Sequence, residues 1–121
     1  MRSAGLDPVG LDRWSGSAGA ALYSNGTASL SFVAVEGQAR LELQVKGEPA
    51  AEVWPHLRSF LNGRPLAEID VNHREPASWI FDARLRNGEN TLEVEYTNDL
   101  KLAREDRNAF LGPVTIHFLQ P

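Results

Sequence analysis

Three carboxylates within eight residues mark the segment of the chain where a site is most readily built. Asp99, Glu105 and Asp106 bracket a short polar loop, and the curled backbone of such a loop exposes carbonyl oxygens. Calcium takes six to eight oxygen ligands from carboxylates, carbonyls and water. These residue types can supply a calcium site in which the adjacent hydroxyls of a sugar replace water. The spacing differs from that of an EF-hand, which needs carboxylates at alternate positions and a central glycine.

The cations of the same loop leave a second interpretation open. Lys101, Arg104 and Arg107 balance the three acids. An ion-paired loop, in which Asp106 and Asn108 hydrogen-bond the backbone, therefore also satisfies the sequence. In the first interpretation, Arg104 and Arg107 would suit an acidic chain such as a uronate-bearing glycan.

A second loop, over residues 46–55, offers an aromatic side chain. Its prolines cannot donate to a strand ladder, so the segment is predicted to lie between strands. It carries Trp54, and His56 follows closely. The flat apolar face of Trp54 suits stacking on a sugar ring, and His56 would donate a hydrogen bond to the same ligand. The alternative is that Trp54 closes the end of the domain and that His56 is an ordinary surface residue.

The sequence contains no recognised catalytic pattern. Its three histidines are scattered, it has no cysteine, and the GxSxG, P-loop and dinucleotide motifs are absent. Glu93 and Glu95 occupy the outer face of a predicted strand, whereas a glycosidase needs two carboxylates that face each other in a cleft. We therefore expect a binding domain and not an enzyme.

The elements that position both loops are predicted to be strands. Apolar and polar residues alternate over residues 39–46, 92–97 and 114–118, the period of a half-buried strand. Asn-Gly pairs at 62–63 and 87–88 predict tight turns, and no segment keeps a helical period. We predict an all-β domain, a jelly-roll β-sandwich of two antiparallel sheets. Its core should contain Leu30, Phe32, Leu41, Leu43, Val45, Leu57, Ile69, Trp79, Phe81, Leu92, Val94, Tyr96, Val114, Ile116 and Phe118.

Length and composition set the limits of function. A chain of 121 residues is long enough for one domain with a real core. We expect residues 1–19 to be a linker or a loosely packed N-terminal arm, with Trp14 docked on a sandwich domain that spans residues 20–121. The net charge of −4 argues against a nucleic-acid partner. No apolar run approaches the roughly 18 residues of a membrane span. The first ten residues lack an apolar signal core, so we expect any export signal to lie outside this sequence.

Three stretches of the sequence resemble the bacterial calcium-dependent xylan-binding modules. They are GEPAAEVWPHLRSFLNGRPLAEIDV, WIFDARLRNGENTLEVEYTND and EDRN. The resemblance is to carbohydrate-binding families thirty-six and sixty and their relatives, and it covers roughly residues 28–119. Its most specific parts are the Asn-Asp pair before the acidic loop, the Asp-Arg-Asn that closes it, and the Trp-Pro before a strand.

This resemblance implies a jelly-roll module attached to a secreted polysaccharide-degrading enzyme, with a loop calcium that coordinates sugar hydroxyls directly. Carried over by position, Asp99 and Asp106 would be side-chain ligands, and carbonyls from Leu100 to Glu105 would complete the sphere. The sequence departs from the family pattern at Ala109 and Gly112, where members commonly have Leu and Asp.

We therefore predict a non-catalytic, secreted or cell-surface module that binds polysaccharide, such as xylan or another chain with vicinal diols, through a loop calcium ion. The expected metal ligands are Asp99, Asp106, Glu105 and the carbonyl of Leu100. The expected glycan contacts are Trp54, His56, Asp99, Asp106, Arg104 and Arg107. The alternative is a structural sandwich that spaces or docks the neighbouring domains of a larger secreted protein, and a weaker one is an accessory fragment of a lyase or esterase. A binding module should leave an aromatic ring exposed beside the acidic loop.

Overall fold

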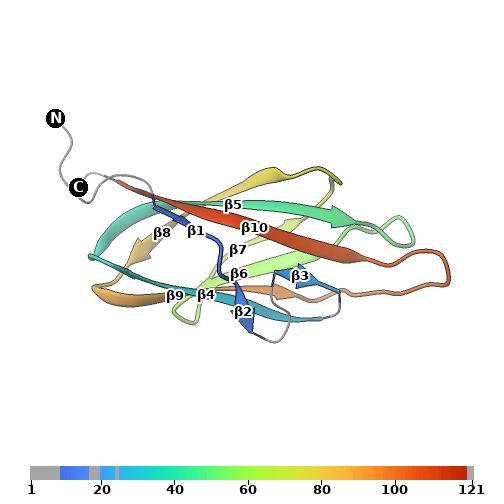
Figure 1. The fold of residues 1–121 in the computed structure, drawn as a ribbon, viewed down its shortest axis with the longest axis horizontal. Helices are drawn as coiled ribbons and strands as arrows, with labels where there is room; N and C mark the ends of the chain where they lie inside the picture. Colours follow the sequence, from blue (N-terminus) through green and yellow to red (C-terminus); the bar gives the residue numbers. More distant parts are fainter. Residues whose placement is uncertain (1–8, 17–19, 24, 120–121) are drawn as a thin grey trace.

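Alternating burial places the strands of this chain in two antiparallel sheets that face each other (Figure 1). The computed structural model describes residues 9–16, 20–23 and 25–119, and within them it has ten strands and no helix. The strands are β1 (Val9–Leu11), β2 (Ser15–Gly16), β3 (Ala21–Leu22), β4 (Gly26–Ala34), β5 (Gly37–Glu48), β6 (His56–Leu61), β7 (Arg64–Asp70), β8 (Ala77–Leu85), β9 (Gly88–Tyr96) and β10 (Asn108–Phe118).

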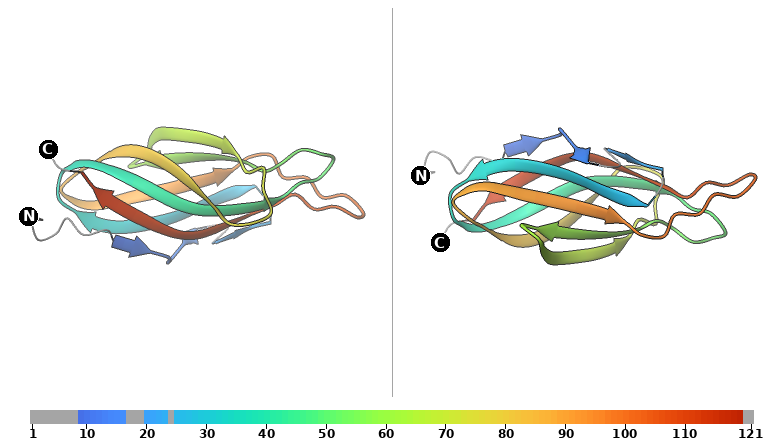
Figure 2. Two further views of the ribbon diagram at one scale, coloured as in Figure 1. Left: turned by 90° about the horizontal axis from the view of Figure 1, so that it is seen from above. Right: turned by 90° about the horizontal axis from the view of Figure 1, so that it is seen from below.

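Each sheet joins strands that are distant in the sequence. Sheet A has the order β1-β10-β5-β8, and β3 also pairs with β10. Sheet B has the order β2-β4-β9-β6-β7. The two views of Figure 2 show these sheets from opposite sides, with sheet A in front on the left and sheet B in front on the right. The predicted all-β sandwich is confirmed.

The core fills the space between the sheets because one side chain in two points inward. In β5 the buried positions run from Ala39 through Leu41 and Leu43 to Val45, and polar residues separate them. The predicted core is confirmed, although Ile69 and Phe118 are only partly buried against it. No helix among the described residues is long and apolar enough to cross a membrane.

Tight turns connect neighbouring strands where the sequence predicts them. Asn62 and Gly63 have φ values of 51° and 82°, the left-handed pair that a two-residue hairpin turn requires. They join β6 to β7, and Gly88, with φ of 90°, begins β9 after the second predicted turn.

Part of the segment expected to be a linker or loose arm adds strands to both sheets. β1 pairs with β10, and β2 pairs with β4. Between them, Trp14 Nε1 donates a hydrogen bond of 2.9 Å to the carbonyl of Gly112, as the expected docking requires. Residues 9–16 therefore belong to the sandwich, and residues 1–8 and 17–19 lie outside the described part of the chain.

Candidate metal and glycan site

The acidic loop extends β9 and β10 as a narrow hairpin at one end of the sandwich (Figure 1). Lys101 and Asp106 form an antiparallel bridge. Arg107 N donates a hydrogen bond of 2.8 Å to the carbonyl of Leu100. Asp99 and Asp106 therefore stand on opposite arms of the hairpin, near its base.

Three buried oxygens of this hairpin have no hydrogen-bond partner in the described structure. They are the Oδ1 atoms of Asp99, Asp106 and Asn108. Asn108 lies close to Asp106, because its Nδ2 is 3.5 Å from the Asp106 carbonyl oxygen. Buried polar atoms in native proteins nearly always have a partner, and oxygen donors of this kind are the ligands that calcium prefers. The side chains present thus fit a calcium ion.

Tyr96 shows that the two carboxylates converge. Its side chain is 1% exposed, and its hydroxyl donates a hydrogen bond to the carbonyl of Arg107. Burial chiefly, then the charge of Asp99 and, more weakly, that of Asp106 raise the pKa of Tyr96 far above its ordinary value. Because the interaction of charges falls with distance, both carboxylates must lie near this one hydroxyl.

Two asparagines fix the backbone around these acids. Asn25 Oδ1 accepts a hydrogen bond of 2.7 Å from Asp99 N. Asn98 Nδ2 donates to the Trp54 carbonyl at 3.0 Å, and its Oδ1 accepts from His56 N at 2.8 Å. The Trp54 loop is thereby tied to the acidic hairpin. Sequence reasoning noticed the Asn98-Asp99 pair but gave neither asparagine this role.

Glu105 and Leu100, two of the expected metal ligands, have other partners. Glu105 Oε2 accepts a hydrogen bond of 2.8 Å from Ala51 N, and the Leu100 carbonyl accepts the bond from Arg107 N described above. No group of three His, Cys, Asp or Glu side chains in the described residues is arranged to hold a metal. The third side-chain oxygen beside Asp99 and Asp106 is instead the amide oxygen of Asn108.

Arg107 does not fit the expected role of a glycan contact. Its side chain is buried, with 6% exposed. Nε donates to the Val53 carbonyl at 2.8 Å and Nη2 to the Ala50 carbonyl at 2.7 Å, while Nη1 bonds the Asn98 carbonyl. The guanidinium fork thus joins the turn before Trp54 to the base of the acidic hairpin.

Both ring nitrogens of His56 also have hydrogen-bond partners. Nε2 lies 2.8 Å from Glu68 Oε1, and Nδ1 lies 2.8 Å from Asp70 Oδ1. The hydrogen bond with Glu68 first, and then that with Asp70, raises the pKa of His56 above its ordinary value. With both nitrogens occupied, His56 does not fit the expected role of a free donor to a glycan.

Trp54 and Arg104 lie where a ligand can reach them. Trp54 is half-buried, and the Arg74 guanidinium stands 5.9 Å from the centre of its ring. Arg104 is exposed at the tip of the hairpin. Among the described residues, no ion pair joins the cations of the loop to its acids, so the ion-paired arrangement is not found.

Two aromatic side chains that sequence reasoning did not select lie beside the candidate site. Tyr23 is 60% exposed and stands two residues before Asn25, while Phe110 follows Asn108 by two residues. Their rings meet edge to face with centres 5.8 Å apart. The period of two along β10 was the available signal, because it places Asn108 and Phe110 on the same face.

Comparison with known protein families decides the classification. A family model described as "Ca-dependent carbohydrate-binding module xylan-binding" (CBM60) matches residues 40–118. The chain belongs to this family. It is a carbohydrate-binding module, and the resemblance inferred from the sequence motifs is confirmed. No curated protein matches the chain.

Solved structures of related modules share the fold at low sequence identity. The CBM36-1 domain of a multidomain xylanase from the hindgut metagenome of Trinervitermes trinervoides is 13% identical, with a TM-score of 0.69 over 95% of this chain and 100% of that one. A CBM36 module in complex with calcium and xylotriose is 14% identical, with a TM-score of 0.65 over 91% of this chain and 98% of that one. The Podospora anserina GH26-CBM35 β-(1,4)-mannanase is 10% identical, with a TM-score of 0.66 over 94% of this chain and 28% of that one.

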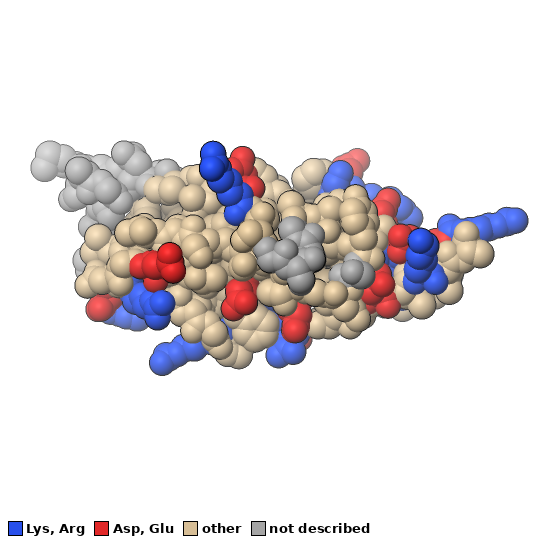
Figure 3. All heavy atoms as spheres, turned by 60° about the horizontal axis from the view of Figure 1, so that its bottom comes forward, with Lys and Arg blue, Asp and Glu red and all other residues tan. Residues whose placement is uncertain are grey.

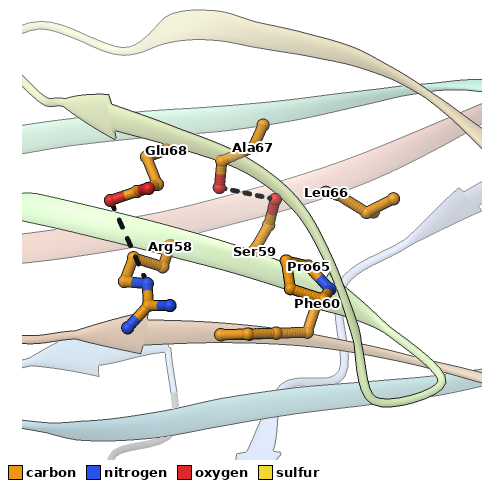
Figure 4. A pocket seen from close by; sticks show the side chains of 7 residues that line it. All are labelled: Arg58, Ser59, Phe60, Pro65, Leu66, Ala67 and Glu68. Atoms are coloured by element: carbon orange, nitrogen blue, oxygen red, sulfur yellow. Dashed lines mark hydrogen bonds and ion pairs between the residues drawn. The ribbon is translucent and has the colours of Figure 1, made fainter.

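A separate hollow of about 280 Å³ lies in the β6–β7 hairpin of the module (Figure 4). It opens where the register of the two strands shifts after Ser59. Ser59 Oγ donates to the Ala67 carbonyl at 3.2 Å, and Arg58 Nε lies 4.0 Å from Glu68 Oε1. None of the three buried oxygens without a partner among the described residues belongs to this hollow.

Charge on the module is mixed in sign. Figure 3 shows blue and red side chains interspersed, and the described residues on that face form no continuous basic stripe. A phosphate backbone would require such a stripe, whereas a neutral or weakly acidic polysaccharide does not.

Proposed function

We propose that this module binds a polysaccharide through a calcium ion held by Asp99, Asp106 and Asn108. The observation that carries the proposal is the set of three buried, unpartnered Oδ1 atoms at the base of the β9–β10 hairpin. The description of the family as calcium-dependent supports the choice of ion, and the related module that binds calcium with xylotriose supports the choice of ligand. The first candidate is xylan or another chain with vicinal diols.

Different residues would hold the calcium ion and fix the backbone around it. Asp99 and Asp106 supply the negative charge, while Asn25 and the Tyr96–Arg107 hydrogen bond fix the backbone of the two arms. When bound, a calcium ion supplies coordination positions at which adjacent sugar hydroxyls replace water. Exposed Arg104, which has no ion-pair partner among the described residues, would favour an acidic substituent on the glycan.

Binding without catalysis is the second part of the proposal. The expected dissociation constant is modest, on the order of 10–1000 μM, because one metal contact and one stacked ring must offset the ordering cost of association. Such a module serves as an accessory that holds a larger secreted or cell-surface protein on its polysaccharide. The similar Podospora mannanase supports this arrangement, since the match covers only 28% of that enzyme chain.

Thermal unfolding with and without calcium tests the ion. A ligand that binds only the native state stabilises it by about 2.7 kcal/mol at one hundred times its dissociation constant. Asp99→Asn and Asp106→Asn should abolish this gain and leave the β-sheet spectrum intact. Magnesium should substitute poorly, because it demands tighter octahedral geometry. A melting temperature that ignores both calcium and chelator would contradict the proposal.

Affinity electrophoresis tests the glycan. Gels with xylan, β-glucan, mannan or pectin are run with calcium or with chelator, and calcium-dependent retardation is expected in xylan. Retardation that survives both chelator and Asp106→Ala would overturn the metal-bridged mechanism. A lack of retardation in every gel would favour the structural spacer.

A further inference from the structure

A hollow of about 220 Å³ lies on the outer face of sheet A, where β10 pairs with β5. Prolines and an aromatic ring make up much of its wall, and two polar side chains stand among them. Its main lining residues are Gln44, Lys46, Pro76, Phe110, Gly112 and Pro113. The proposed calcium site does not use this hollow.

The hollow depends on a bulge in β10. The register with β5 shifts between Leu111 and Val114, so Gly112 and Pro113 both stand opposite Gln44. A Cβ atom on Gly112 would lie 3.0 Å from the Cβ of Gln44, so a side chain there would press on β5. The hydrogen bond from Trp14 Nε1 to the Gly112 carbonyl holds the bulge in place.

Three residues of β10, Asn108, Phe110 and Gly112, form a strip from the candidate metal site to the hollow. They share the outer face of the strand, because Ala109 and Leu111 point into the core. Gly112 lies four positions after Asn108 along the strand, a distance of about 13 Å at the usual rise per residue. Asn108 carries one of the unpartnered oxygens. The strip thus begins at the metal site and ends in the hollow.

The character of the strip suits a sugar ring. The Tyr23 and Phe110 rings pack edge to face, and Lys46 Nζ lies 5.4 Å from the centre of the Phe110 ring. An aromatic floor with a few polar groups at its rim is typical of ligand sites, and it matches the apolar face and hydroxyl edge of a pyranose. The hollow is smaller than the roughly 300–1,000 Å³ of sites for drug-sized ligands. It therefore has room for one ring.

We propose that this hollow is a second sugar subsite, so that a polysaccharide anchored at Asp99 and Asp106 runs along sheet A over Phe110. The proposal rests on the proposed function. The subsite takes a further sugar residue of the same chain, and affinity grows with chain length.

The indole N–H signals of Trp14 and Trp54 provide a test of direction by NMR. Trp14 Nε1 bonds Gly112 in the wall of the hollow, whereas Trp54 lies in the loop that Asn98 ties to the acidic hairpin. We expect calcium-loaded protein titrated with xylohexaose to shift the Trp14 signal and to leave the Trp54 signal in place. A shift of the Trp54 signal with an unmoved Trp14 signal would overturn the proposal.

A matched pair of variants tests the aromatic floor. Phe110→Ala should weaken binding of xylohexaose about tenfold, which corresponds to roughly 1.4 kcal/mol, and leave xylobiose affinity and calcium stabilisation unchanged. Phe60→Ala is the control, because Phe60 is also half-exposed and also lies under a cation, with Arg58 5.3 Å from its ring centre (Figure 4). It lies in sheet B and should leave both affinities unchanged.

The outcomes separate this inference from the function on which it rests. Equal affinity for xylobiose and xylohexaose, or no loss in Phe110→Ala, would overturn the subsite and leave calcium-dependent binding intact. If neither oligosaccharide binds in the presence of calcium, the proposed function fails for xylan and the subsite fails with it.

Discussion

Asp99 and Asp106 bring two carboxylates near one tyrosine hydroxyl, with one oxygen of each buried and unpartnered. Like charges that lie near one another repel, and a partly buried place screens this repulsion less than water does. Such an arrangement is unfavourable for the folded state unless a cation compensates it. The same two residues should therefore destabilise the protein without calcium and stabilise it with calcium.

This sign reversal is the first prediction. In chelator, Asp106→Asn should raise the free energy of unfolding by on the order of 1 kcal/mol, because it removes the repulsion between the two carboxylates. In calcium the variant should be less stable than the parent, because it loses the gain from binding. Urea denaturation in both buffers measures the two differences. A variant equally destabilised in both buffers would give Asp106 a purely structural role.

Glu105→Gln is the matched control for that experiment. The Glu105 carboxylate accepts a hydrogen bond from Ala51 N, which a glutamine oxygen can also accept. We expect this variant to keep the calcium shift of the parent. If this variant lost the calcium-dependent gain in stability, Glu105 would be a metal ligand, as the sequence predicted.

Residue types in the sequence identified the carboxylates, but they did not show which side chains face the site. Asp99 and Asp106 stand out because two acids bracket one loop. Glu105 was selected for its proximity along the chain, yet its carboxylate accepts a hydrogen bond from Ala51 N. Asn108 was assigned only a backbone hydrogen bond, because an amide next to an arginine carries no sequence signal of metal binding.

At the scale of elements, the turn before Trp54 is held in a strained form. Ala51 and Glu52 have φ values of 53° and 64°, a left-handed conformation that favours Asn and Gly in two-residue turns. The contacts of Arg107 with the Ala50 and Val53 carbonyls maintain it. Strain of this kind persists where the surrounding structure enforces it.

Relief of that strain is the second prediction. Replacing Ala51 by Asn and Glu52 by Gly should raise the free energy of unfolding by about 1–2 kcal/mol, since such residues remove left-handed strain at these positions. Chemical denaturation of the double variant measures the change. The Asn62–Gly63 turn, which already has the favoured pair, provides the control. Gly63→Ala should lower stability through left-handed strain alone, because Gly63 has φ of 82° and an added Cβ there would meet no other atom within 4 Å. A loss of stability in the double variant would show that the Glu52 side chain contributes more than its strain costs.

In the β6–β7 hairpin, the His56 ring is held between two carboxylates and can titrate, which gives the third prediction. Glu68 and Asp70 raise the pKa of His56 in the folded state, so folding favours the protonated ring. The stabilisation is fully present below the unfolded pKa of about 6.5, and it is lost as the pH rises through the higher folded pKa. Melting temperatures across this range should fall more steeply for the parent than for His56→Gln. Identical pH profiles of the two proteins would contradict the assignment.

Strands with a clear pattern were predictable, and short strands were not. The alternation in β5, β9 and β10 follows from one buried face, so the sequence carries it directly. β1 and β2 have three and two residues, too few for a period, and they form because β10 and β4 offer open edges. The bulge at Gly112 likewise depends on the partner strand.

At the scale of the whole molecule, the two ends of the sandwich differ in their contents. Val9 pairs with Ile116, so the start of β1 and the end of β10 lie together. Figure 1 shows them at the end of the sandwich opposite the acidic hairpin and the Trp54 loop. Alternation and turns predicted this two-layered body, but the sequence did not predict which loops would meet at one end, because that follows from the strand order of both sheets.

This separation gives the last prediction. A fluorescent protein fused to either end of the chain should leave calcium stabilisation and retardation in xylan gels unchanged, because the start of β1 and the end of β10, the described segments nearest the two ends, lie far from the hairpin. The same protein inserted after Ala103, at the exposed hairpin tip, should abolish both, since the bridge between Lys101 and Asp106 would no longer hold the two arms together. Melting curves and affinity gels of the three fusions give the comparison. Loss of calcium binding in the end fusions, with a retained β-sheet spectrum, would locate the metal at the other end of the sandwich and overturn the assignment of Asp99 and Asp106.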